Sequence, residues 1–306
     1  MITLRERYRG ALLGLAAGDA VGTTVEFSPP GTFTPVTDMV GGGPFHLRPG
    51  EWTDDTSMAL CLAESLLERR GFDPTDQMDR YVRWRNHGHL SANGRCFDIG
   101  NTVADALRRF EATGNPWAGS TDPYSAGNGS IMRLAPVPLF YAADAAQAIA
   151  LSGDSSSTTH GAAACIDACR YLGGLIIGAL RGETKATLLA PFYHPVPGAT
   201  WQLDPTIAAI AAGSFAHKSP PAIRGSGYVV ESLEAALWAF YRGETFAEGC
   251  LLAVNLGHDA DTTAAVYGQL AGTYYGAAGI PTAWANRLAH RDLIIDFADR
   301  LHDRDG

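Results

Sequence analysis

Several features that assign proteins to common functional classes are missing from this chain of 306 residues. It has no Lys/Arg-rich run and its net charge is -9, so sequence-independent binding to nucleic acid is not expected. No apolar run is long enough to predict a transmembrane helix, so no membrane association is expected. Neither a P-loop nor a dinucleotide-binding glycine motif is present. The sequence therefore gives no support to the common nucleotide-binding α/β folds.

Cysteine is also scarce. The five cysteines form an odd set in a long chain, which argues against a disulfide framework and favours a reducing compartment; we expect a cytoplasmic protein. His160, Cys165 and Cys169 lie close in sequence and could form part of a metal site. No second Cys/His pair completes a closed zinc site, so buried reduced thiols on a helix are the better interpretation.

Helical periodicity dominates what is present, whereas strand-like alternation is scarce. The pattern predicts an all-α protein, and no linker divides the chain, so we expect one domain over residues 1–306. The predicted helices cover residues 5–17, 57–70, 74–87, 98–111, 158–180, 228–241, 246–256, 262–276 and 291–301. Residues 19–52, rich in Gly, Pro and Thr, are predicted to form a long loop.

Glycines recur every four residues in the first predicted helix, at Gly10, Gly14 and Gly18. This spacing places them on one face of the helix, where the absence of side chains lets a second backbone approach closely. The sequence therefore predicts a tightly packed helix pair that involves the N-terminal helix.

Two acidic clusters, TDDT at 53–56 and DADTT at 259–263, each precede an apolar helical run. N-capping explains one side chain at a helix start. Thr53 or Asp54 could supply it in the first cluster, and Asp261 and Thr262 could do so in the second. Each cluster, however, has two acids and additional hydroxyls, and adjacent like charges are destabilising unless they are neutralised. The pair predicts a site for two hard divalent cations. Ligands that are all oxygen favour Mg²⁺ or Mn²⁺.

Four other positions carry weaker signals. The segment GNGSIMR at 127–133 has glycines beside polar groups and could cradle a phosphate or a ribose, but a tight turn before a helix also explains it. Glu26 is open to interpretation as a solvated loop acid, and Asp98 as the N-cap of a helix. His160 could serve packing or capping as well as chemistry.

Taken together, these motifs resemble the ADP-ribosylglycohydrolase family, and most of all its dinitrogenase-reductase-activating branch. The matching stretches are GALLGLAAGDAVGTTVEF at 10–27, EWTDDTSMAL at 51–60, CFDIGNT at 96–102, GNGSIMRLAPV at 127–137, STTHGAAA at 157–164, GYVVESLEAALWAF at 227–240 and GHDADTTAAVYGQLAG at 257–272. They follow the family's order over nearly the whole chain. The resemblance implies a compact all-helical single domain with a binuclear metal site in a cleft.

The resemblance also implies roles for individual residues. The implied ligands of two Mg²⁺ or Mn²⁺ ions are Thr53, Asp54, Asp55, Asp259, Asp261 and Thr262. The implied ADP-ribose pocket contains Asn128, Gly129, Ser130, Met132, His160 and Tyr228, with His160 near the diphosphate and Tyr228 near the ribose or the leaving group. The implied catalytic residues are Asp98 near the scissile bond, Glu26 on a loop beside the metals, and the metal ligands Asp55 and Asp261.

The activity that this resemblance implies is hydrolysis of the N-glycosidic bond between ADP-ribose and a protein arginine, with ADP-ribose as a product. The context of Asp98 favours arginine, but serine, O-acetyl-ADP-ribose and nucleobase linkages are alternatives. Outside hydrolysis of this bond, the chain could be a non-catalytic ADP-ribose-binding protein or a binuclear phosphoesterase. The complete set of acids argues against the binding protein, and the scarcity of histidine argues against the phosphoesterase. We expect a monomer.

Overall fold

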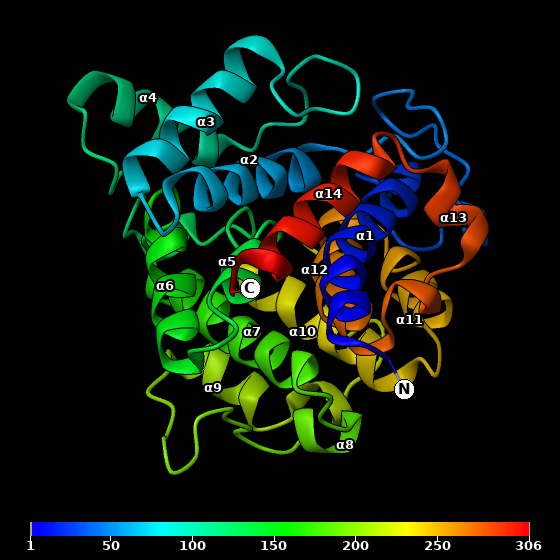
Figure 1. Cartoon of the computed structure of the whole chain (residues 1–306). Coiled ribbons are helices and arrows are strands. Elements are labelled where there is room, and N and C mark those ends of the chain that lie inside the picture. Colours follow the sequence, from blue (N-terminus) through cyan, green and yellow to red (C-terminus); the bar gives the residue numbers. More distant parts are fainter. Residues whose placement is uncertain (1, 306) are drawn as a thin grey trace.

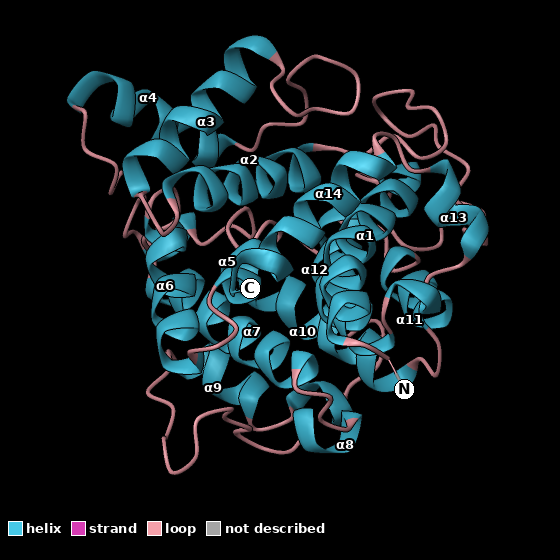
Figure 2. Ribbon diagram, in the orientation of Figure 1, coloured by secondary structure: helices cyan, strands magenta, loops and turns pink. Residues whose placement is uncertain are grey.

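The computed structural model describes residues 2–305 and is built from helices (Figure 1). The α-helices in this range are α1 (Leu4–Gly22), α2 (Asp54–Arg69), α3 (Pro74–His87), α4 (Asn101–Thr113), α5 (Pro136–Phe140), α6 (Ala145–Ser157), α7 (Ala163–Leu180), α8 (Lys185–Leu188), α9 (Pro205–Ala211), α10 (Val229–Arg242), α11 (Phe246–Val254), α12 (Ala260–Tyr275), α13 (Thr282–Arg287) and α14 (Arg291–His302). Short 3₁₀ helices are η1 (Thr23–Val25), η2 (Pro123–Ser125), η3 (Ser214–His217), η4 (Ala277–Gly279) and η5 (Asp303–Asp305). Between residues 2 and 305 there is no strand (Figure 2), so the expected all-α class is confirmed.

The helices α1 and α12 form an antiparallel pair, with α12 behind α1 in the view of Figure 1. Their backbones are in contact along the predicted glycine stripe. A Cβ atom added at Gly14 would lie 2.3 Å from the carbonyl oxygen of Gly268, and one added at Gly18 would lie 2.0 Å from that of Ala264. No side chain fits in this seam. The predicted close helix pair is therefore confirmed.

The same seam sets the position of two acidic residues. A Cβ atom at Gly22, the last residue of α1, would lie 2.4 Å from the Cα atom of Asp261 in the first turn of α12. Because the helices run antiparallel, the C-terminal end of α1 lies beside the N-terminal end of α12. Asp19, one turn before the end of α1, is thereby brought close to the second acidic cluster.

Four predicted boundaries are wrong. The helix expected at 57–70 begins three residues earlier, at Asp54. Helix α1 extends to Gly22, so residues 19–22 belong to it and not to the following loop. The helix expected at 98–111 begins at Asn101, after a left-handed residue at Asp98. The helix expected at 158–180 begins only at Ala163, because residues 158–162 form a turn between α6 and α7. Helix α6 and the short helices α5, α8, α9 and α13 were not predicted.

Helix α7 is the structure's most apolar long helix, and length and composition alone would let it cross a membrane. However, 72% of its window from Ala163 to Leu180 is buried inside the protein. It contacts α6, α10 and α12, as the central helix of a folded core does. Its apolar character is explained by this burial.

Candidate active site

The two acidic clusters meet at the ends of α2 and α12. The hydroxyl oxygen of Thr53 lies 3.2 Å from Asp55 Oδ2 and 3.3 Å from Asp261 Oδ2. The hydroxyl of Thr262 lies 3.4 Å from the same Asp55 oxygen. Asp55 and Asp261 are almost completely buried. Folding therefore joins two segments that are far apart in the sequence into one patch of oxygen atoms.

The alternative explanation by helix capping is wrong for both clusters. Thr53 and Asp259 occupy the N-cap positions of α2 and α12, and neither side chain forms a capping hydrogen bond. The helix N-termini still favour the negative charge of the first-turn acids Asp54, Asp55 and Asp261. The acids therefore lie at helix starts, but they do not accept capping hydrogen bonds from the backbone amides there.

Asp19 is a site residue that the sequence did not reveal. Its carboxylate is fully buried and accepts four hydrogen bonds: Oδ1 from the amide and hydroxyl of Thr53 (2.8 and 2.9 Å), and Oδ2 from the amide and hydroxyl of Thr56 (3.1 and 2.6 Å). Burial raises the pKa of Asp19 to about 6, although these hydrogen bonds oppose the rise. One carboxylate oxygen of Asp19 also lies within 4.8 Å of oxygens of Asp55 and Asp261. Because its lone pairs are engaged by donors, Asp19 positions Thr53 and α2 and does not itself have a free ligand atom. The sequence did contain a signal for this role, because Asp19 is an acidic residue within a stretch of small apolar residues.

Three carboxyl oxygens at this site have no hydrogen-bond partner although they are buried: Glu26 Oε2, Asp55 Oδ1 and Asp261 Oδ1. Burial, together with the neighbouring carboxylates, raises the pKa of Asp54, Asp55 and Asp261 well above the usual range. A buried unpaired acceptor costs about 1–3 kcal/mol. The arrangement lacks positive charge, and bound cations would supply it.

Glu26 and Asp98 form a second acidic group with Asp261, in which ligand oxygens of the three residues lie within 4.8 Å of one another. Glu26 is only 4% exposed, so its interpretation as a solvated loop acid is wrong. Asp98 precedes the N-cap of α4 by two residues, so the N-cap interpretation is wrong as well. Burial first, and then the neighbouring acids, raise the pKa of Glu26 to about 10 and that of Asp98 to about 7.

The backbone around this pair is unusual. Phe27, Asp98 and His258 all have positive φ angles of 57–60°, a conformation that non-glycine residues seldom adopt and that is enriched at functional sites. The amide of Phe27 donates to the carbonyl of His258 at 2.6 Å, which ties the Glu26 loop to the segment before Asp259. The strained positions thus hold acids from three segments at one place.

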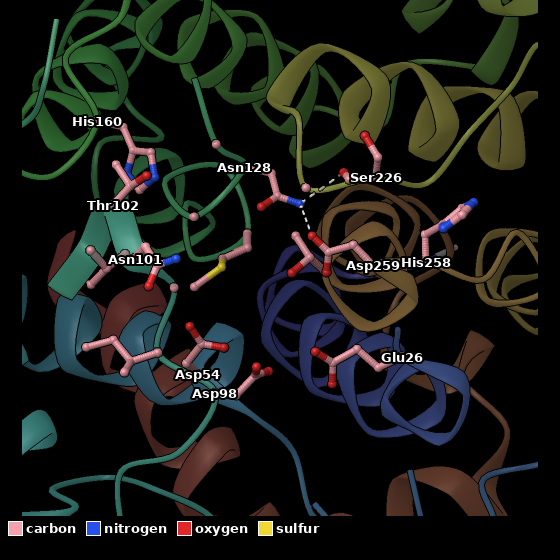
Figure 3. Close-up of a pocket in the computed structure, with 18 of the residues that line it drawn as sticks. Glu26, Asp54, Asp98, Asn101, Thr102, Asn128, His160, Ser226, His258 and Asp259 are labelled. Atoms are coloured by element: carbon pink, nitrogen blue, oxygen red, sulfur yellow. Dashed lines mark hydrogen bonds between the residues drawn. The ribbon is translucent and has the colours of Figure 1, made fainter. Parts of the chain in front are cut away.

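A cavity of about 660 Å³ opens above the acids (Figure 3). The predicted site residues in its lining are Glu26, Asp54, Asp98, Asn128, Gly129, Met132, His160, Asp259 and Thr262. Asn128 donates from Nδ2 to Asp259 Oδ2 at 2.7 Å, so the glycine-rich segment touches the acidic cluster directly (Figure 3). Thr53, Asp55 and Asp261 lie beneath this lining as buried groups.

Two predicted pocket residues do not line this cavity. Ser130 is buried behind it, where its hydroxyl accepts from Ser156 at 2.9 Å. Tyr228 is 41% exposed and lines a separate, smaller cavity of about 200 Å³ beside the start of α7. Only its backbone pairs with the glycine-rich segment, through an isolated bridge to Gly127.

The thiols near His160 do not form a metal cluster. Cys165 and Cys169 are buried free thiols, and their sulfur atoms contact the Gly127 carbonyl at 3.3 Å and the Ser130 hydroxyl at 3.5 Å. In the described part of the chain, the groups able to hold a metal ion consist of carboxylates alone. The interpretation as buried thiols is confirmed.

Comparison with known proteins places these features in context. A family model described as ADP-ribosylglycohydrolase matches residues 1–306. The chain is 44% identical to "ADP-ribosylarginine hydrolase Tri1" of Serratia proteamaculans (97% of this chain, 79% of the relative) and 47% identical to the protein of the same name of Pseudomonas putida (98% and 78%). It is 31% identical to "ADP-ribosyl-[dinitrogen reductase] glycohydrolase" of Rhodospirillum rubrum (94% and 91%), so the dinitrogen reductase branch is the more distant of these. A solved structure titled "ADP-ribosylglycohydrolase-related protein complex" superposes with a TM-score of 0.86 at 47% identity, over 99% of both chains.

Proposed function

The chain belongs to the ADP-ribosylglycohydrolase family, and from this premise we propose that it removes ADP-ribose from arginine side chains of modified proteins. The proposal is supported by the two relatives named ADP-ribosylarginine hydrolase, which share 44% and 47% of their aligned residues with this chain. It is carried by one structural observation: buried carboxyl oxygens without partners lie directly beneath a large cavity.

The donor set fits two hard divalent cations, which we propose to be Mg²⁺ or Mn²⁺. The orphaned oxygens of Asp55 and Asp261 are hard ligands, and burial together with the neighbouring carboxylates raises the pKa of both side chains. The proposed ligands are Thr53, Asp54, Asp55, Asp259, Asp261 and Thr262. Bound ions of this kind supply Lewis acidity and a template for hydroxyl groups and water.

The protein's own residues account for the proton that hydrolysis must move. Cleavage transfers the hydroxyl of a water molecule to the ribose carbon and its remaining proton to the departing guanidine. Glu26 and Asp98 are adjacent carboxyl groups that line the cavity, so a proton held between them gives the site a donor and an acceptor together. We assign water activation and leaving-group protonation to this pair. Surrounding carboxylates stabilise positive charge that develops on the sugar ring.

The decisive experiment is incubation of the protein with an arginine-ADP-ribosylated protein, with Mg²⁺, with Mn²⁺ and with a chelator, followed by mass spectrometry of the products. We expect free ADP-ribose and unmodified arginine, released only in the presence of a cation. A parallel serine-linked substrate tests the linkage.

Each alternative has its own outcome in this experiment. Release of AMP would identify a phosphoesterase. Binding of ADP-ribose without release from any substrate would identify a binding protein. Preference for the serine-linked substrate would overturn the assignment to arginine while leaving the hydrolase in place.

A further inference from the structure

Arg133 is a buried cation behind the cavity wall. Its side chain is 1% exposed, it forms no ion pair with any residue between 2 and 305, and its Nε has no hydrogen-bond partner among them. Nη1 donates to the carbonyl of Gly129 at 2.8 Å, Nη2 donates to the hydroxyl of Thr159 at 2.7 Å, and the guanidinium lies 4.7 Å from the ring centre of Tyr81. A buried charge without a counterion is costly, so this position calls for a specific role.

Thr159 links this cation to His160. The Thr159 hydroxyl oxygen is fully buried and lies 2.9 Å from His160 Nδ1. An arginine in a protein is always protonated and only donates, so the Thr159 oxygen accepts from Arg133. The hydroxyl proton of Thr159 then has one acceptor among the described residues, which is His160 Nδ1.

The direction of this bond fixes the form of the imidazole. If Nδ1 accepts, a neutral ring carries its proton on Nε2. With the proton on Nδ1 instead, the Thr159 oxygen would accept from both Arg133 and His160, and its own hydroxyl proton would be left without an acceptor in a buried position, at a cost of about 1–3 kcal/mol. The buried arginine therefore selects one tautomer through the intervening hydroxyl.

The Nε2 edge of His160 faces the candidate site. His160 lines the cavity although it is only 2% exposed, and no residue between 2 and 305 forms a hydrogen bond with its Nε2 atom. Cβ atoms built at Gly127 and Gly129 would lie 3.4 and 3.2 Å from Nε2. Two glycines thus leave room around a donor that has no partner in the protein.

We infer that Arg133 and Thr159 are positioning residues that lock His160 as a neutral Nε2–H donor to an acceptor atom of the bound ligand. This inference rests on the proposed function for the identity of that ligand, the ADP-ribosyl group. It assigns His160 a binding role and excludes it as an acid or a base in the reaction. Burial and the nearby Arg133 charge also lower the pKa of His160 to about 3, in agreement with a neutral ring.

The tautomer is directly measurable. Proton–nitrogen correlation spectra of the ¹⁵N-labelled protein with Mg²⁺ at pH 7 distinguish protonated from unprotonated ring nitrogens. His160→Gln identifies the signals of His160 among the nine histidines. We expect a proton on Nε2 and none on Nδ1. A proton on Nδ1, or on both nitrogens, would overturn the inference whether or not the protein binds ADP-ribose.

Variants of Thr159 test the link to binding. Thr159→Val removes the hydroxyl, and we expect the single tautomer to be lost and the affinity for ADP-ribose to fall about tenfold, the equivalent of one hydrogen bond. Thr159→Ser keeps the hydroxyl and should restore both properties. Thr158→Val is the matched control, because Thr158 is equally buried but its hydroxyl bonds Ser155 and Gln77 instead.

The outcomes separate the two proposals. An unchanged tautomer of His160 and an unchanged affinity for ADP-ribose in Thr159→Val would overturn the inference that Arg133 and Thr159 fix the tautomer. Absence of ADP-ribose binding to the wild-type protein would instead contradict the proposed function, and the spectra would still decide the tautomer. His160→Gln, which keeps a neutral N–H donor, should weaken ADP-ribose binding less than His160→Leu. Equal abolition of kcat by both variants, with affinity unchanged, would indicate an acid or base and overturn the inference.

Discussion

Two regions of the cavity bury charge of opposite sign. We call the buried acids Asp55 and Asp261 the floor, and the buried residues Arg133, Ser156, Thr159 and His160 the wall. In the floor, Asp55 and Asp261 bury negative charge and leave carboxyl oxygens without partners. In the wall, Arg133 buries positive charge, but its Nη1 and Nη2 atoms donate to acceptors and only its Nε lacks a partner among the described residues. An aromatic ring lies beside the guanidinium, and the Ser156 hydroxyl bonds Ser130 and the His160 carbonyl. The floor is incomplete without cations, whereas the wall is already formed.

This difference separates two ways of building a site. Buried acids without partners lower the stability of the folded protein, and bound cations would restore it. Metal binding to the floor would therefore stabilise the fold. A set of satisfied hydrogen bonds stabilises the fold and holds donors in place before any ligand arrives. Substitutions in the two regions should therefore change stability in opposite directions when no metal is present.

The largest effect is expected from Asp55→Asn. Loss of this carboxylate should lower kcat/KM about a thousandfold, or about 4 kcal/mol, because it removes a proposed metal ligand and a negative charge beside the proposed reaction centre. In a chelator, the same variant should melt at or above the wild-type temperature, since a buried charge has been removed. Near-normal turnover with metal, measured by ADP-ribose release, would refute the role of the floor.

The seam that supports the floor should be the next most sensitive feature. Gly18→Ala inserts a methyl group about 2.0 Å from a backbone oxygen, so α1 and α12 must separate. We expect a loss of about 3 kcal/mol in chemical unfolding, which outweighs the gain of about 1 kcal/mol in helix propensity. Gly71→Ala is the control, because the nearest atom to its added Cβ lies at an ordinary 3.5 Å. Equal stability of both variants would mean that the seam tolerates expansion.

In the wall, Ser156→Ala should destabilise the protein by about 1–2 kcal/mol, because it removes the side-chain donor to the buried His160 carbonyl and one of the two partners of the Ser130 hydroxyl. The loss should be the same with Mg²⁺ and with a chelator, in contrast to Asp55→Asn, whose effect on the melting temperature should change sign. Denaturant titrations under both conditions measure this. A metal-dependent effect of Ser156→Ala would break the distinction between floor and wall.

The last effect concerns pH. The folded-state pKa of Asp98 is raised from 3.8 to about 7, so between these values the folded protein keeps a proton that the unfolded chain has lost. This group's contribution to stability therefore falls as pH rises through that window, by at most about 1.4 kcal/mol per pH unit. Without metal, Asp98→Asn should gain stability relative to the wild type as the pH is raised from 5 to about 7. The exposed control Asp292→Asn should show no such trend. A constant difference would show that Asp98 ionises normally.

Much of the fold could be predicted from local patterns, because helical periodicity and the glycine stripe are properties of neighbouring residues. The failures occurred where distant contacts decide. Asp98 stands next to a helix like an N-cap, but it adopts a left-handed conformation before the helix begins, and its carboxylate lies within 4.8 Å of that of Glu26. Helix α6 was missed because its serine-rich end lacks an apolar stripe, and it is stabilised by contacts with α7.

The sequence by itself determined the helical class, the family resemblance and the presence of two acidic clusters, because these depend on residue type and spacing. Three other features were decided only by the tertiary structure. Some buried carboxyl oxygens lack partners, Asp19 accepts hydrogen bonds from the start of α2, and Thr159 links Arg133 to His160. The reason is physical. Desolvation and hydrogen-bond direction depend on which segments surround a group, and the contact of α1 with α12 sets those surroundings for the acids.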